Sequence, residues 1–94
     1  MKADLVVYDL TKIEHYHKVL FNRALFGFID NSNHGSYQYK RKGILSEINH
    51  LRLLKGAIIV KKSEIYRIMP YFKKYKVKYQ TYDISINPKI LKKP

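Results

Sequence analysis

Two short, unbroken apolar runs constrain the fold of this chain more than any other feature. Ala57 to Val60 contains no polar residue, and Leu5 to Tyr8 is the only comparable run among the 94 residues. Such a run is typical of a strand that is buried on both faces of a sheet. A helical pattern follows each run, so we expect two similar strand–helix–strand halves that share one small core.

The first helix is predicted to run from Thr11 to about Phe26. Thr11 and Glu14 have the spacing of a capping box, and Gly27 is suited to end the helix in a left-handed conformation. Val19 and Phe26 lie off the apolar stripe of this helix. They either contact a second layer or a partner, or are covered by loops.

The second long helix is predicted to begin at Ser63, which can cap it. Its buried face would contain Ile65, Ile68, Met69, Phe72 and Tyr75. Pro70 lies within this pattern and removes a backbone hydrogen bond. We therefore expect a kink or a break near Met69.

Three segments lie between the first helix and the run that begins at Ala57. Asp30 to Gly35 is predicted to be a loop, because it is rich in residues that form Asx turns. Tyr37 to Lys42 reads as an edge strand, since its charges discourage strand-to-strand aggregation. For Ile44 to Lys55 a short helix is preferred, with an irregular strand or a loop as the alternative.

The last strand is predicted to begin at about Lys76. Its apolar positions change parity near Thr81, which indicates a bulge or a change of partner. Residues 87–94 form a basic tail that we expect to be flexible. The chain is therefore expected to be one compact α+β domain, residues 1–86, followed by this tail.

This order of elements predicts a ferredoxin-like βαβ-βαβ sandwich. It would have one four-stranded sheet, two main helices on one face, and a short extra helix in the 44–55 insert. The two apolar runs would be parallel central strands, and the Lys-rich runs would be the edges. The opposite face of the sheet would be open to a ligand or a second copy.

The charge of the chain is strongly unbalanced. There are 19 Lys and Arg against 7 Asp and Glu, for a net charge of +12 with neutral histidines. Such an excess destabilises the fold by self-repulsion, which a polyanionic partner would relieve. Nucleic acid is the preferred partner, with an anionic membrane, an acidic protein or simple solubility as alternatives. Glutamate occurs only at positions 14, 47 and 64, which disfavours a balanced ion-pair surface.

The composition also excludes several classes of protein. The chain has no cysteine, so disulfides and thiolate metal sites are excluded. No apolar run approaches the ~20 residues that a membrane-spanning helix needs. We expect an intracellular, cytoplasmic protein.

Tyrosines and basic residues are interleaved in two segments. Tyrosine rings stack on unpaired bases, for about 1–3 kcal/mol per base, while Lys and Arg neutralise phosphates. The alternative is that these tyrosines face the helices as core residues. The predicted nucleic-acid-binding residues are Tyr37, Tyr39, Lys40, Arg41, Lys42, Lys61, Lys62, Arg67, Lys73, Lys74, Lys76 and Lys78.

Two weaker patterns would support catalysis. The segment Leu5 to Leu10, which contains Asp9, is similar to the opening strand of the small ferredoxin-like CRISPR adaptation proteins. The resemblance implies that Asp9 could bind a divalent metal, although Mg²⁺ usually needs further ligands. His34, with nearby Tyr and Lys residues, could cleave RNA without a metal. We assign no catalytic residue, no metal ligand and no cofactor.

We therefore expect a non-enzymatic nucleic-acid-binding protein, with RNA somewhat favoured over DNA. It would be an accessory subunit of a larger nucleic-acid-processing or ribonucleoprotein complex, with a protein partner or a second copy of itself. The alternatives are a small metal-dependent or His-based nuclease, and an adaptor that binds a protein through Val19 and Phe26.

Overall fold

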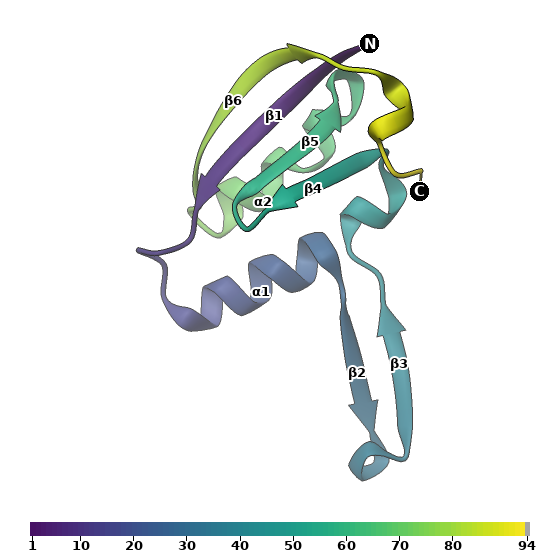
Figure 1. The fold of residues 1–94 in the computed structure, drawn as a ribbon. Helices are drawn as coiled ribbons and strands as arrows, with labels where there is room; N and C mark the ends of the chain where they lie inside the picture. Colours follow the sequence, from purple (N-terminus) through teal and green to yellow (C-terminus); the bar gives the residue numbers. More distant parts are fainter. Residues whose placement is uncertain (94) are drawn as a thin grey trace.

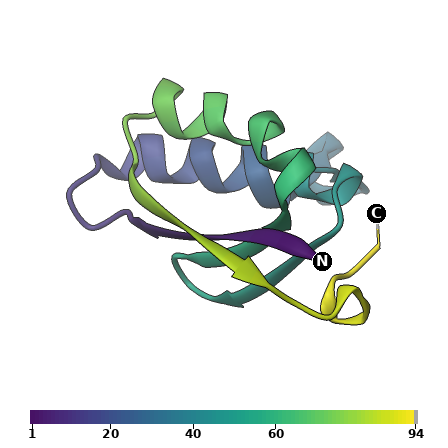
Figure 2. The same ribbon diagram turned by 90° about the horizontal axis from the view of Figure 1, so that it is seen from above.

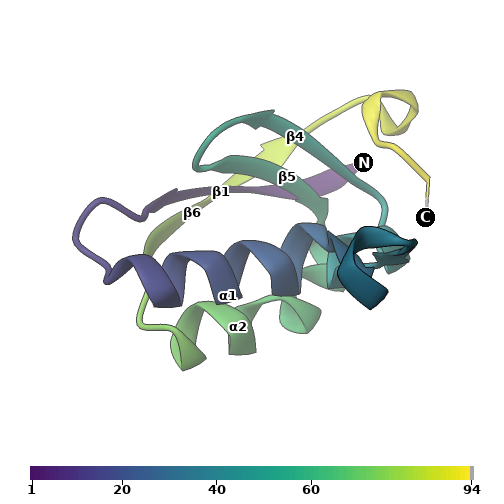
Figure 3. The same cartoon turned by 90° about the horizontal axis from the view of Figure 1, so that it is seen from below.

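The computed structural model describes residues 1–93 and has two layers, an antiparallel sheet and helices on one of its faces (Figures 1 and 2). The sheet contains β1 (Lys2–Asp9), β4 (His50–Leu54), β5 (Ala57–Lys61) and β6 (Lys78–Ser85), in the order β4-β5-β1-β6. The helices α1 (His15–Phe26) and α2 (Met69–Lys74) lie side by side (Figure 3). A hairpin of β2 (Phe28–Ser32) and β3 (Tyr37–Arg41) stands away from this body (Figure 1).

The main core lies between the sheet and the helices. Val6 and Tyr8 of β1 and the alternate residues of β5 pack there against Phe21 of α1 and Phe72 of α2. The Tyr8 ring meets both phenylalanine rings edge to face, at centroid distances of 5.5 and 5.4 Å. Fully burying one such apolar side chain is worth about 1.5–3 kcal/mol, so this cluster accounts for much of the stability.

A smaller core covers part of the opposite face of the sheet. Ala3 and Ile59 are buried there beneath Leu91 of the C-terminal segment. This segment is held to the edge strand β4 by two backbone hydrogen bonds between His50 and Lys92, at 2.7 and 3.1 Å. Because both faces of β1 and β5 are apolar, the central strands lack the usual polar alternation.

The predicted ferredoxin-like βαβ-βαβ sandwich is wrong. The two apolar runs do form the central strands, but they pair antiparallel, with Leu5 opposite Ile59. The chain forms a four-stranded sheet and a separate two-stranded sheet, and Tyr37 to Lys42 borders the second, not the first. The second of the two predicted main helices is a 3₁₀ segment, Lys62–Arg67, followed by the six-residue α2.

The insert between the halves also differs from its prediction. Ile44–Glu47 forms a 3₁₀ turn, and the edge strand β4 follows in place of a short helix. Leu45 and Ile48 are buried by this turn, whereas Leu51 pairs with Ile59 in the sheet. Leu45, Ile48 and Leu51 have the spacing of residues on one face of a helix, although they contact different layers of the structure.

The predicted loop at Asp30 to Gly35 begins inside a strand. Residues 28–32 form β2, which pairs along its whole length with β3. Polar Asx formers are poor strand residues by propensity, but the partner strand satisfies their backbone groups. Residues 33–36, which include the short turn Asn33–Gly35, lie outside the ladder.

The helix boundaries were predicted in part. The expected break near Met69 is confirmed, because α2 begins there with Pro70 in its first turn. Gly27 ends α1 as expected, but with φ 80° and ψ −177° it does not adopt the left-handed helical conformation that was predicted. The capping box is wrong: α1 begins at His15, and the backbone N–H and hydroxyl of Thr11 both donate to Asp9 Oδ1 instead.

The bulge predicted near Thr81 is absent from β6, which pairs with β1 in unbroken register. Tyr79 packs on Phe72 at the helix face, whereas Ile84 packs against the smaller core. The apolar positions of β6 change parity because one face of the strand packs against the helices and the other face packs against the smaller core. No helix within residues 1–93 is long and apolar enough to cross a membrane.

Candidate nucleic-acid interface

The hairpin carries the first group of predicted binding residues. We call residues 28–42 the arm; they lead away from the C-terminal end of α1 and return toward the 3₁₀ turn (Figure 1). Every residue of β3 is exposed. No residue of the arm belongs to either core cluster within the described part of the chain. The arm is therefore presented to solvent without supporting the body.

The root of the arm is a close contact between two glycines. A Cβ at Gly27 would overlap the carbonyl oxygen of Arg41 and lie 2.8 Å from the Gly43 nitrogen. A Cβ at Gly43 would overlap the carbonyl oxygen of Leu25. Both strands therefore leave the body through a gap that only glycine permits, and this contact sets the direction of the arm.

The register divides the arm into two faces. Opposite residues in an antiparallel pair share a face, and Asp30 is opposite Tyr39. Tyr37, Tyr39 and Arg41 therefore lie on one face, where the Arg41 guanidinium is 5.6 Å from the centre of the Tyr39 ring. Arg41 also binds Asp30 at 3.2 Å. Lys40 lies on the other face.

Both predicted arm tyrosines are exposed, Tyr37 by 55% and Tyr39 by 49%. The alternative interpretation, that Tyr37, Tyr39 and Tyr79 face the helices as core, is therefore wrong for the two arm tyrosines, whereas Tyr79 does pack on Phe72 of α2. Lys40 and Lys42 are exposed and form no ion pair within residues 1–93. These side chains combine flat rings with uncompensated positive charge.

A second group of predicted residues lies at the junction of α2 and β6. Lys73, Lys74, Lys76 and Lys78 are all exposed there. Lys76 has φ 56° and turns the chain from the helix into the strand. This junction is remote from the arm, which leaves the body near the other end of α1 (Figure 3). The structure thus does not bring the two groups together.

The remaining predicted residues are separate again, and two of them are engaged within the protein. Lys62 binds Asp4 at 2.9 Å and also contacts Asp83. Arg67 binds Glu47 at 2.7 Å and Glu64 at 3.4 Å. Lys61 is exposed beside them. Lys62 and Arg67 consequently have less charge to offer a phosphate than the arm lysines.

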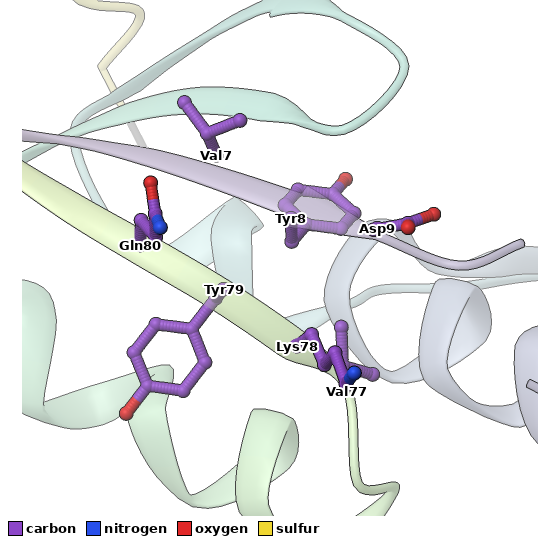
Figure 4. Close-up of a pocket in the computed structure, with 7 residues that line it drawn as sticks. All are labelled: Val7, Tyr8, Asp9, Val77, Lys78, Tyr79 and Gln80. Atoms are coloured by element: carbon purple, nitrogen blue, oxygen red, sulfur yellow. The ribbon is translucent and has the colours of Figure 1, made fainter. Parts of the chain in front are cut away.

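Two cavities flank the end of β1, and Tyr8 and Asp9 line both of them. The first, of about 570 Å³, is lined by Val7, Val77 and Tyr79 among others, and the Val7 and Tyr79 side chains point to opposite sides of the sheet (Figure 4). Burial raises the pKa of the Tyr8 hydroxyl, against the opposing effects of the Arg52 charge and a hydrogen bond from the Gly56 backbone. The hydroxyl therefore remains a hydrogen-bond donor at neutral pH.

The second cavity, of about 460 Å³, gathers three cations that the sequence analysis did not select. Lys18 comes from α1, Arg52 from β4 and Lys55 from the β4–β5 turn. They are isolated from one another in sequence and lie in no tyrosine-rich segment. No local pattern could have indicated that they converge.

Asp9 is the residue that the resemblance marked as a possible metal ligand. Hydrogen bonds from the Thr11 backbone and hydroxyl lower its pKa, and the charges of Lys12 and Lys78 act in the same direction. The carboxylate is thus ionised, but one of its oxygens is occupied and its surroundings are cationic. The described residues contain no group of three His, Asp or Glu side chains that could hold a metal ion.

The remaining candidates are His34 of the nuclease hypothesis and Val19 and Phe26 of the adaptor hypothesis. His34 is exposed at the tip of the arm, in a left-handed conformation with φ 56°. Phe26 packs against the main core, and the Arg52 guanidinium lies 3.9 Å from the centre of its ring. Val19 is half-buried. Phe26 is therefore not the exposed docking residue that the adaptor hypothesis needs.

Comparison with known proteins returned no match to this chain, whether with protein-family models, with curated proteins or with solved structures.

Proposed function

We propose that this protein binds nucleic acid through its arm, as a non-enzymatic accessory subunit of a larger complex. The observation that supports the proposal best is the exposure of Tyr37 and Tyr39 beside Lys40 and Lys42, on a hairpin that contributes nothing to the core. An element of this kind costs the fold conformational entropy and offers it no burial in return. A ligand that orders it and uses its side chains would explain its presence.

The chemistry of the arm favours single-stranded RNA. Tyr37 and Tyr39 share one face, so their rings can stack on two successive unpaired bases. Lys40, on the face opposite the tyrosines, and Lys42, at the root, can contact phosphates. Arg41, paired with Asp30, would hold the Tyr39 ring in place, with a smaller part in phosphate binding.

The direct test compares two double variants of the arm for binding to a labelled single-stranded RNA. Tyr37→Ala/Tyr39→Ala removes both stacking surfaces, so we expect affinity to fall by at least tenfold, from ~1–3 kcal/mol per base. Lys40→Gln/Lys42→Gln removes two phosphate contacts and should also weaken binding. The measurement is fluorescence anisotropy at a fixed moderate salt concentration.

The control variant is Tyr16→Ala/Tyr66→Ala, which removes two exposed tyrosines that lie outside the arm. It should leave the affinity within about twofold. If the control and the arm variants weaken binding equally, or if the wild-type protein binds neither RNA nor DNA, the proposal is wrong.

A further inference from the structure

The second cavity beside the end of β1 is rich in cationic side chains. We call it the cationic cavity, and its relevant residues are Asp9, Thr11, Lys18, Asn22, Arg52 and Lys55. It is formed where the end of β1, the first turns of α1 and the β4–β5 turn meet. It lies apart from the arm and contains none of the residues on which the proposed function depends.

The fold restrains the Arg52 side chain and the backbone at Lys55. The Arg52 guanidinium stacks on Phe26, at 3.9 Å from its ring centre, which limits the orientations of this long side chain. Lys55 lies in a turn that is tied to β1 by a 2.8 Å hydrogen bond from the Tyr8 N–H to the Gly56 carbonyl oxygen. The Arg52 guanidinium and the backbone of this turn are therefore positioned by the fold, while both side chains are exposed.

The helix supplies the opposite wall. Lys18 and Asn22 are one turn apart on α1, so they share a face, and both are half-buried. Neither side chain forms a hydrogen bond or an ion pair within residues 1–93. An ammonium group and an amide thus face the cavity without a protein acceptor.

The net positive charge of the cavity favours an anionic ligand. Lys18, Arg52 and Lys55 have no ion-pair partner within the described chain, and Asp9 is the only acid in the lining. Asp9 Oδ1 already accepts two hydrogen bonds from Thr11, at 2.8 and 2.7 Å. A planar guanidinium with two ammonium groups matches the oxygens of a phosphate.

We propose that the cationic cavity binds a phosphomonoester, carried either by the end of a nucleic-acid strand or by a free nucleotide. The remaining oxygen of Asp9 would accept a hydrogen bond from a sugar hydroxyl. The strand-end form of the ligand rests on the proposed nucleic-acid binding, whereas the free-nucleotide form does not.

The test uses the full-length protein and five probes. These are one short RNA with a 5′-phosphate, with a 3′-phosphate or with neither, together with adenosine monophosphate and adenosine. We expect one phosphorylated RNA to bind about tenfold more tightly than the unphosphorylated RNA, and the monophosphate to bind more tightly than adenosine. A tenfold difference in affinity corresponds to ~1.4 kcal/mol, which is within the range of a single hydrogen bond to a charged group.

Lys18→Gln/Lys55→Gln should abolish the preference for phosphate but leave binding of the unphosphorylated RNA nearly unchanged. Lys89→Gln/Lys93→Gln removes the same charge from the C-terminal segment and should keep the preference. Thermal unfolding verifies that both variants remain folded. Arg52→Lys keeps the charge but loses the planar fork, so it should reduce the preference without removing it.

The outcomes separate the two proposals. If every RNA binds equally and the monophosphate binds no better than adenosine, the cavity proposal is overturned and the proposed function stands. If the monophosphate binds through Lys18 and Lys55 while no RNA binds, the cavity proposal stands and the proposed function fails. A preference that survives in Lys18→Gln/Lys55→Gln also overturns the cavity proposal.

Discussion

Asp4 is the only buried acidic residue among residues 1–93, and its charge is compensated by Lys62. The Lys62 ammonium lies 2.9 Å from Asp4 and also contacts Asp83 on the neighbouring strand. Hydrogen bonds to Asp83 and then to Asp4 raise the pKa of Lys62. A residue that the sequence analysis assigned to nucleic-acid binding thus joins three segments of the fold.

Replacing Lys62 should destabilise the protein. Lys62→Met leaves the buried carboxylate of Asp4 without its partner, so we expect a loss in the free energy of unfolding that clearly exceeds the change in the control variant. Urea denaturation measures this loss. The matched control is Lys61→Met, an exposed neighbour without an ion pair, which should change stability by no more than about 0.5 kcal/mol.

The pH dependence of this difference provides a check. Because the pKa of Lys62 is raised in the folded protein, its contribution to stability is fully present below the pKa of the unfolded state, about 10.4. That contribution is lost as the pH rises through the pKa of the folded state. The lowered pKa of Asp83 means that its contribution is present above about 3.9 and is lost as the pH falls through the folded value. A Lys62→Met effect that is the same at neutral and strongly alkaline pH would contradict this account.

At the scale of elements, the arm and the body differ in what they contribute to the hydrophobic core. The core clusters draw on the four-stranded sheet, the helices, the 3₁₀ segments and the C-terminal segment. The arm touches the body mainly at its root, where Gly27 and Gly43 meet, and where the Arg23 guanidinium lies 4.5 Å from the centre of the Phe28 ring. The body should therefore fold without the arm.

Replacing residues 28–42 with a linker of about four Gly and Ser residues tests this division, since the two ends are already adjacent. The melting temperature should change by only a few degrees, because no core side chain is removed. RNA binding should fall to the weak level that the rest of the basic body provides. The measurements are calorimetry and fluorescence anisotropy.

Either of two results would contradict this division. The first is an armless protein that does not fold, which would mean that the root contact supports the core. The second is an armless protein that binds RNA as tightly as the wild type, which would move the interface to the α2–β6 junction or elsewhere on the body.

At the scale of the whole molecule, charge is only partly compensated. Of the 19 Lys and Arg residues, Arg41, Lys62 and Arg67 form ion pairs within the described chain, and these pairs occupy five of the seven acids. Most of the cations that remain lie on the arm, at the α2–β6 junction, in the cationic cavity and on the C-terminal segment, and the others are Lys2, Lys12, Arg23 and Lys61. Binding should therefore depend strongly on salt, whichever groups contact the phosphates.

The salt dependence distinguishes phosphate contacts from other contacts. For a single strand, each phosphate contact that is lost should reduce the slope of log K against log salt by ~0.7. Lys40→Gln/Lys42→Gln should therefore reduce it by about 1.4, whereas Tyr37→Ala/Tyr39→Ala should weaken binding at an unchanged slope. A slope that is unchanged in the lysine variant would exclude these two lysines from the phosphate path.

Some elements were predictable because their signals are local. The apolar runs at Leu5 and Ala57 become the central strands, Gly27 ends α1, and Pro70 separates the 3₁₀ segment from α2. The edge strand β4 was mistaken for a helix because Leu45, Ile48 and Leu51 have helical spacing while contacting different layers. Pairing with a distant strand overrides local propensity, and one sequence contains no direct signal for it.

The candidate sites also differ in whether the sequence alone could identify them. The exposed tyrosines and lysines of the arm were selected because they are neighbours in the sequence. The cationic cavity was missed because Lys18, Arg52 and Lys55 meet only when β4 pairs with β5 beside α1. Side chains that converge from separate elements leave no periodic pattern.

The amino-acid sequence by itself determined the net charge, the two strands at the centre of the sheet and the residues rich in tyrosine and lysine, since each depends on composition or on nearest neighbours. Only the tertiary structure decided that those strands are antiparallel, that β2 and β3 form a separate arm, and that three distant cations share a cavity. The physical reason is that strand partners and convergent side chains are set by packing between segments far apart in the chain, where burial and backbone hydrogen bonding outweigh local preference.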